Sequence, residues 1–76
     1  MVTSYEYKGI KDMTTGETLK YLRIKAGLTQ AELSFRTRIT NQMISFYECG
    51  RSEPRFDVMC KLIKAMGYEI EIKEKK

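Results

Sequence analysis

Residues 29–50 read TQAELSFRTRITNQMISFYECG, and this stretch decides the predicted fold. Thr29 and Glu32 have the spacing of a capping box: the threonine hydroxyl accepts from a free N–H of the first helical turn, and the carboxylate accepts from the N–H of the cap residue. Thr40 can begin a second helix through its own hydroxyl. The stretch therefore predicts two short helices joined by a tight turn.

The second of these helices has two unlike sides. Ile44 and Tyr47 are three residues apart and share one side, which suits a core. Polar and aromatic side chains gather toward another side, which contains Asn41, Gln42, Ser45 and Phe46. Unpaired amides are costly to bury, so this side is predicted to face away from the core.

The composition sets the class of protein. A chain of 76 residues makes one small domain, which buries only roughly 60% of its unfolded surface and gains stability from dimerisation. The formal net charge of +4 favours an anionic partner, although charge of this size is also ordinary for a soluble domain. No apolar run is long enough to cross a membrane, and residues 1–8 lack the features of a signal peptide. A cytoplasmic location is expected.

Catalytic and metal-binding residues are sparse. The chain has two cysteines, Cys49 and Cys60, and no histidine, so zinc would lack ligands and the histidine-activated nucleophiles are excluded. We interpret both cysteines as reduced and partly buried, with a disulfide as the alternative. No glycine-rich phosphate loop or carboxylate pair is present. We therefore expect no enzyme activity, no metal and no cofactor.

The flanking segments complete the expected chain. Residues 1–13 form a leader, in which Tyr5 and Tyr7 alternate with polar residues as in an edge strand; a partly ordered arm is the alternative. Thr14 and Glu17 form a second capping box, which predicts a helix that Gly27 ends.

The loop 50–55 precedes a helix over 56–66 whose stripe of apolar residues is assigned to the core, namely Phe56, Met59, Leu62, Ile63 and Met66. Residues 68–76 predict a C-terminal strand, because Tyr68, Ile70 and Ile72 alternate with charged residues. A lone strand cannot satisfy its hydrogen bonds, so this strand would pair either with the leader or with the same strand of a second copy. The second arrangement gives a two-fold dimer.

The chain resembles the Cro/repressor type of helix-turn-helix proteins, also called the Xre family, over about residues 17–67. The matching positions are Leu22-Arg23, Gly27-Leu28-Thr29-Gln30, Glu32-Leu33, Ile44-Ser45, Glu48, Gly50 and Pro54. The resemblance implies a mainly α, lambda-repressor-like domain of four to five helices over residues 14–67, here with the C-terminal strand as an addition.

Two positions depart from the family pattern, Ser34 and Arg38. In the family, a glycine is common at the place of Arg38, because the turn needs a positive φ. That conformation costs a residue with a Cβ about 1 kcal/mol or more. Arg38 either accepts this strain or bends the turn differently.

The resemblance also implies roles for individual residues. Asn41 and Gln42 would contact base edges in the major groove, because side-chain amides pair bidentately with adenine. Phe46 and, from the flank, Met43 would press on thymine methyl groups. Contacts to the DNA backbone would come from Gln30, Thr40, Ser45, Arg51 and Arg55. For all of these residues the alternative is an ordinary role as solvated, capping or packing side chains.

Arg23 and Glu48 are assigned to structure, because the equivalent pair in the family is a semi-buried ion pair. The predicted function is a homodimeric, sequence-specific regulator of transcription, in particular a repressor, that binds double-stranded DNA at a pseudo-palindrome. An antitoxin that also binds a toxin protein is an alternative, because some antitoxins pair a C-terminal strand across the dimer. A protein-interaction module without DNA is a further alternative.

Overall fold

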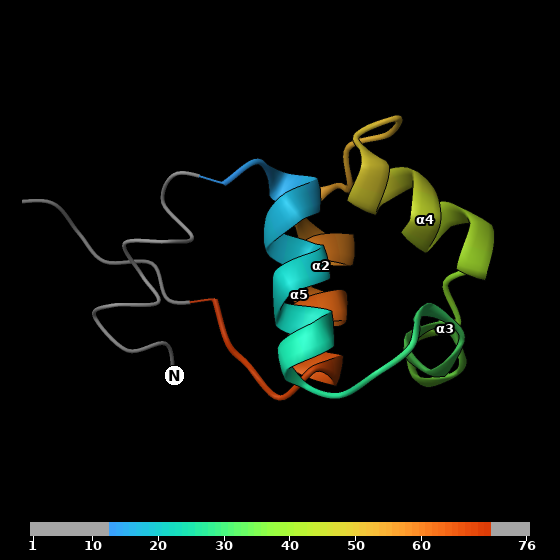
Figure 1. Cartoon of the computed structure of the whole chain (residues 1–76), viewed down its shortest axis with the longest axis vertical. Helices are drawn as coiled ribbons and strands as arrows, with labels where there is room; N and C mark the ends of the chain where they lie inside the picture. Colours follow the sequence, from blue (N-terminus) through green and yellow to red (C-terminus); the bar gives the residue numbers. More distant parts are fainter. Residues whose placement is uncertain (1–12, 71–76) are drawn as a thin grey trace, which may run out of the picture.

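The structure is a computed structural model, and it describes residues 13–70 (Figure 1). This part of the chain contains the helices α2 (Thr15–Lys25), α3 (Gln30–Thr37), α4 (Asn41–Cys49) and α5 (Phe56–Ala65), and no strand. α2 and α3 each pack against both α4 and α5. No helix within the described range is long and apolar enough to span a membrane.

The predicted helix starts are confirmed by their caps. Thr14 and Glu17 form a complete capping box before α2, and Thr29 and Glu32 form one before α3. The Thr40 hydroxyl accepts from the N–H of Met43 at 3.1 Å and begins α4. These local bonds satisfy N–H groups that a helix start leaves free, so the sequence fixes where each helix begins.

The core lies where the four helices meet. Its buried members come from every helix, from the loop before α3 and from the C-cap of α5: Leu19, Leu22, Leu28, Leu33, Ile44, Tyr47, Leu62, Ile63 and Met66. Ile44 and Tyr47 are both in this cluster, which confirms the predicted inward side of α4. The helix that carries the amides is thus anchored through one side only.

One core assignment is wrong. Phe56 was expected in the apolar stripe of α5, but 62% of its surface is exposed. It is the first residue of α5, and the stripe enters the core only from the half-buried Val58 and Met59 onward. Helical spacing predicts the side on which a residue lies, but not whether another helix covers that end.

The C-terminal strand is not found in the described residues. Tyr68 donates its backbone N–H to the carbonyl of Ile63 at 3.1 Å, and its side chain packs against the core. Gly67 adopts a φ of 89° and turns the chain back onto the end of α5. The N–H of Tyr68 therefore completes a helix end instead of a sheet ladder. Ile72 and the remainder of 71–76, like the expected leader strand around Tyr5, lie outside the described residues.

Candidate nucleic-acid interface

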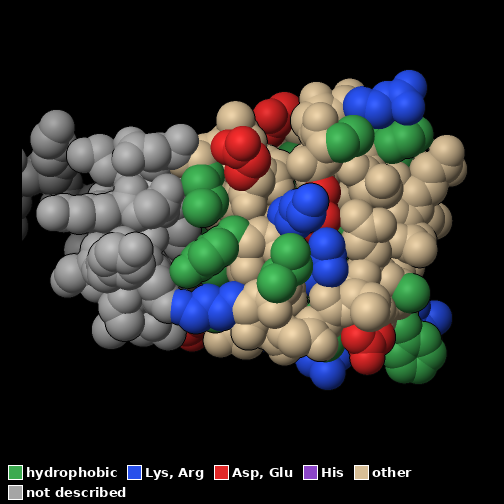
Figure 2. Space-filling model, viewed as in Figure 1, with side chains coloured by type: hydrophobic (Ala, Val, Ile, Leu, Met, Phe, Trp, Pro, Cys, Tyr) green, Lys and Arg blue, Asp and Glu red, His purple; other side chains and the backbone are tan. Residues whose placement is uncertain are grey.

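The first turn of α4 projects two amide side chains outward. Asn41 and Gln42 are both exposed, whereas Ile44, which lies nearly opposite Gln42 around the helix, is fully buried. The surface over α4 is mostly tan in Figure 2, the colour of the backbone and of side chains that are neither charged nor hydrophobic. Two exposed amides, each with donors and an acceptor and held on an anchored helix, have the chemistry needed to pair with base edges.

Met43 and Phe46, the other two residues predicted to contact bases, are less exposed than the amides. Met43 is half-buried and packs against the core, and Phe46 is half-buried near the C-terminal end of α4. Ser45 is half-buried between them in sequence, and Thr40 is exposed with its hydroxyl engaged in the cap. The structure therefore exposes Asn41 and Gln42 more fully than Met43 and Phe46.

The turn before α4 contains a strained residue. Arg38 ends α3 in the left-handed conformation, with φ 65° and ψ 15°, and its N–H donates to Ser34 at 2.8 Å. Of the two alternatives for this position, the chain accepts the strain. The preceding Thr37 is buried, and its hydroxyl donates to Leu33 at 2.8 Å and accepts from Ile39 at 3.3 Å. These hydrogen bonds stabilise the turn that sets the orientation of α4 relative to α3.

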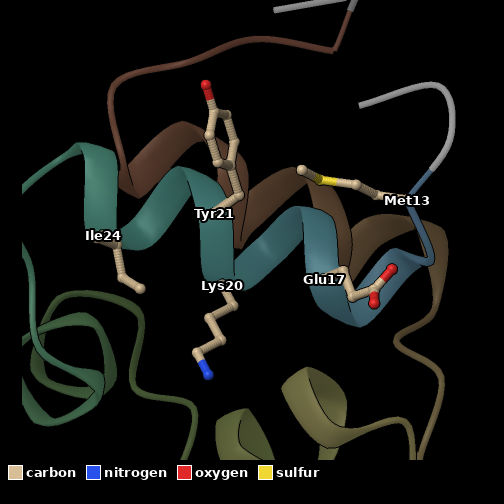
Figure 3. A pocket seen from close by; sticks show the side chains of 5 residues that line it. All are labelled: Met13, Glu17, Lys20, Tyr21 and Ile24. Carbon is tan, nitrogen blue, oxygen red and sulfur yellow. The ribbon is translucent and has the colours of Figure 1, made fainter. Parts of the chain in front are cut away.

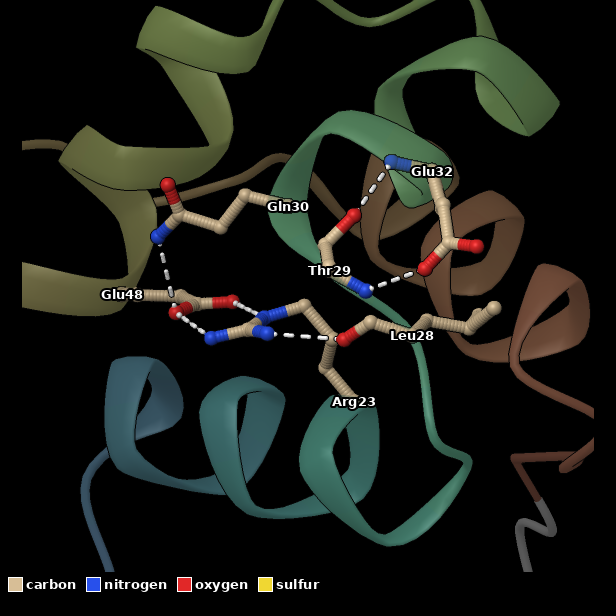
Figure 4. A network of polar contacts seen from close by, with 6 residues as sticks. All are labelled: Arg23, Leu28, Thr29, Gln30, Glu32 and Glu48. Carbon is tan, nitrogen blue, oxygen red and sulfur yellow. Dashed lines mark hydrogen bonds and ion pairs between the residues drawn. The ribbon is translucent and has the colours of Figure 1, made fainter.

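Three helices are tied together by Glu48, near the end of α4 (Figure 4). Arg23 of α2 donates to the Glu48 carboxylate twice, from Nε at 2.7 Å and from Nη2 at 3.1 Å. Gln30 of α3 donates to the same carboxylate from Nε2 at 3.1 Å. Arg23 also donates to the carbonyl of Leu28 at 2.8 Å. Only 12% of the Arg23 side chain and 5% of the Glu48 side chain are exposed. The expected ion pair between Arg23 and Glu48 is thus present, and Gln30 joins it through a hydrogen bond to Glu48.

The electrostatics of this cluster follow from the hydrogen bonds. The bond to Glu48 raises the pKa of Arg23 above its ordinary, already high value, although burial acts in the opposite direction. Arg23 therefore stays charged. A two-point contact between guanidinium and carboxylate fixes orientation as well as distance, so the end of α4 is held at a defined angle to α2.

Gln30 takes part in this cluster while keeping capacity for another partner. It is the first residue of α3 and is half-buried. A side-chain amide has two N–H donors, and Glu48 accepts from this nitrogen. The second donor can therefore serve an anionic ligand without releasing Glu48.

The two arginines of the loop after α4 differ in their surroundings. The guanidinium of Arg51 lies 4.7 Å from the centroid of the Phe46 ring. Arg55 has 87% of its side chain exposed and a 3.8 Å contact with Asp57, two residues further on. Sequence reasoning treated the two cations alike, whereas the structure holds only Arg51 against α4.

Sequence reasoning missed a close approach of α2 to α4. Gly16, in the first turn of α2, is buried, and a Cβ built there would lie 2.7 Å from the carbonyl oxygen of Glu48 and also collide with that of Tyr47. A glycine inside a predicted helix, where it is disfavoured, was the available signal. Gly16 lets the last turn of α4 rest directly on α2.

A hollow beside α2, within the part of the chain that the structure describes, offers little for a small ligand. This hollow of about 340 Å³ is lined by Met13, Glu17, Lys20, Tyr21 and Ile24. Their side chains spread apart from one another (Figure 3), whereas ligand sites have polar groups that converge. Among residues 13–70, no cluster of acidic or sulfur side chains could hold a metal ion. Both cysteines are free thiols. Cys60 is partly buried, as predicted, whereas Cys49 is exposed, so the prediction is wrong for Cys49.

Comparison with known proteins places this arrangement among helix-turn-helix proteins. The family model described as "Helix-turn-helix" matches residues 19–73. The endothelial differentiation-related factor 1 homolog of Danio rerio is 32% identical over 62 residues, which is 82% of this chain and 42% of that protein. The multiprotein-bridging factor 1 of Candida albicans is 30% identical over 59 residues, 78% of this chain and 39% of that protein. The chain thus spans about two fifths of the length of these relatives.

Proposed function

Because the chain belongs to the helix-turn-helix family of the Cro/C1 type, we propose that it regulates transcription by binding a specific double-stranded DNA sequence, through residues 14–67. The observation that carries this proposal is the exposure of Asn41 and Gln42 on a helix whose inward side, with Ile44 and Tyr47, is buried. Both side chains reach base edges when α4 enters the major groove.

The surrounding residues take supporting roles in this proposal. The free N–H of Gln30 donates to a phosphate, and Thr40 and Ser45 contact the DNA backbone beside the amides. Phe46 and Met43 are the candidates for contact with thymine methyl groups. Arg51 and Arg55 neutralise phosphates at the end of α4, in keeping with the net charge of +4.

A homodimer that represses transcription is the finer form of the proposal. Two copies related by a two-fold axis would place their α4 helices on half-sites about 34 Å, or one helical turn of DNA, apart. Tyr68, Ile70 and Ile72 are proposed to form the dimer contact. Ile70 is the most exposed hydrophobic residue of residues 66–70. Its side chain is therefore accessible to a second copy of the chain. The antitoxin alternative rested on a paired C-terminal strand, and nothing in residues 68–70 favours it.

Selection of bound duplexes from a random pool tests the proposal directly. We expect one sequence to be enriched at low salt. Asn41→Ala and Gln42→Ala should each reduce discrimination at one base position by about 1–3 kcal/mol, because a bidentate amide–adenine pair is lost. Absence of enrichment, or alanine variants that discriminate as well as the parent, would refute base recognition by α4.

The contribution of phosphate contacts is measured from the dependence of affinity on salt. Arg51→Ala and Arg55→Ala should weaken binding to all sequences alike and reduce the salt slope by about one unit each. Lys61→Ala is the matched control, because Lys61 is exposed on α5 and lies outside the proposed interface. An unchanged slope in both arginine variants would contradict phosphate contact by this loop.

A protein partner is a second candidate function. Phe35 of α3 has 83% of its surface exposed, and exposed aromatic side chains are common anchors of protein interfaces. One relative bears the name "multiprotein-bridging factor". If the protein binds a partner through α3, Phe35→Ser should abolish co-purification of that partner while the affinity for the selected DNA stays the same. Equal recovery of partner with the parent and the variant would exclude this surface.

A further inference from the structure

Phe46 holds Arg51 in two ways. The guanidinium of Arg51 lies 4.7 Å from the centroid of the Phe46 ring, within the roughly 6 Å over which a cation is attracted to an aromatic face. The backbone N–H of Arg51 also donates to the carbonyl of Phe46 at 2.9 Å, and Ser52 donates to the same carbonyl at 3.3 Å. One residue thus fixes both the main chain and the charged end of Arg51.

The turn between them makes this arrangement possible. Gly50 has a φ of 83°, which reverses the chain at the end of α4. Residues with a side chain rarely adopt this conformation. Within residues 13–70, Arg51 forms no ion pair with a carboxylate, so no acidic side chain of this range neutralises its charge.

The ring that supports Arg51 lies on the outward side of α4. Phe46 follows Gln42 by four residues, so the two lie one above the other along the helix. Ile44 lies on the opposite side and is buried. The guanidinium stacked on Phe46 is therefore held by the residue one turn beyond Gln42 on the outward side of α4.

We propose that Phe46, instead of serving as one of the two candidates for contact with thymine methyl groups, is a positioning residue that presents the Arg51 guanidinium to a DNA phosphate at the edge of the major groove. This inference rests on the proposed function. Arginine donors match phosphate geometry, and a long side chain that is already ordered loses less entropy on binding. The stack therefore gives the loop after α4 one prearranged phosphate contact.

A double-mutant cycle tests this assignment on the duplex selected by the parent protein. The dissociation constants of the parent, Phe46→Leu, Arg51→Ala and the double variant are compared by fluorescence anisotropy. We expect Phe46→Leu to weaken binding about threefold to tenfold, because the side chain of Arg51 is no longer ordered in advance. The same change should have almost no effect when Arg51 is already alanine. Phe46→Tyr keeps the ring and should bind like the parent.

A second duplex separates positioning from contact with thymine. Every thymine of the selected site is replaced by deoxyuridine, which removes only the methyl groups. If Phe46 positions Arg51, the ratio of the parent and Phe46→Leu affinities is the same on both duplexes. The inference is overturned if this ratio falls to one on the uracil duplex, or if the effects of Phe46→Leu and Arg51→Ala multiply in the double variant. Failure of the parent to select any duplex would instead refute the proposed function itself.

Discussion

At the scale of single residues, the turn before α4 has a cost that can be measured. Arg38 has a φ of 65°, in the left-handed region, where a Cβ costs about 1–2 kcal/mol. Arg38→Gly should therefore increase the free energy of unfolding by about 1 kcal/mol. Denaturant titration measures the change. Arg36→Gly is the control within α3 and should reduce stability by about 1 kcal/mol, because glycine is disfavoured inside a helix. A destabilised Arg38→Gly variant would show that the side chain contributes more than the strain costs.

A second residue-scale prediction concerns the cap of α3. The pKa of Glu32 is lower than its ordinary value of 4.5. The larger cause is the hydrogen bond from the backbone N–H of Thr29 to the carboxylate, and the second is the contact of the carboxylate with the Thr29 hydroxyl. A carboxylate whose pKa is lower in the folded state stabilises the protein above pH 4.5, and that contribution is lost as the pH falls through the lowered pKa. Glu32→Gln should therefore be less stable than the parent at neutral pH, and the difference should shrink with acidification.

Thermal unfolding followed by circular dichroism between about pH 3 and pH 7 checks this dependence. Glu53→Gln is the control, because Glu53 lies in the exposed loop between α4 and α5. A difference between the parent and Glu32→Gln that stays constant over this range would mean that the charge of the carboxylate does not contribute to the cap.

At the scale of elements, the contact between α2 and α4 depends on the absence of a side chain at Gly16. A Cβ there would collide with main-chain carbonyls of Tyr47 and Glu48, which cannot rotate away as a side chain can. Gly16→Ala should reduce the free energy of unfolding by about 2 kcal/mol, even though alanine is the better helix former. Denaturant titration measures this, with Lys20→Ala as the control at an exposed position of α2. Equal or greater stability of Gly16→Ala would contradict the close approach.

The elements also show how far the sequence predicts this structure. Helix starts were predictable because Thr14, Thr29 and Thr40 cap through bonds to residues only three positions away. The exposed amides followed from the spacing within α4. The stack of Arg51 on Phe46 and the exposure of Phe56 were not predictable, because they depend on how a loop returns and on where neighbouring helices end. Alternation over residues 68–72 suggested a strand, but Tyr68 is used at the end of α5.

At the scale of the whole molecule, the proposed dimer has a thermodynamic consequence. Unfolding of a dimer releases two chains, so the midpoint of thermal unfolding rises with protein concentration. We expect such a rise between about 1 μM and 100 μM for the parent. Ile70→Lys should remove the concentration dependence, whereas Glu69→Lys, at the exposed neighbouring position, should keep it. A parent whose midpoint is independent of concentration would rule out dimerisation in this range.

Because α4 is anchored through one side, the residues needed for folding differ from the residues proposed to recognise DNA. Substitutions at Ile44, Tyr47 or Glu48 disturb the scaffold, whereas Asn41 and Gln42 make no contribution to the core. Under the proposed function, substitution of Asn41 and Gln42, in evolution or by design, can change the DNA sequence that the protein binds with little loss of folding stability. Target preference is then free to diverge among copies of such a gene while their architecture stays the same.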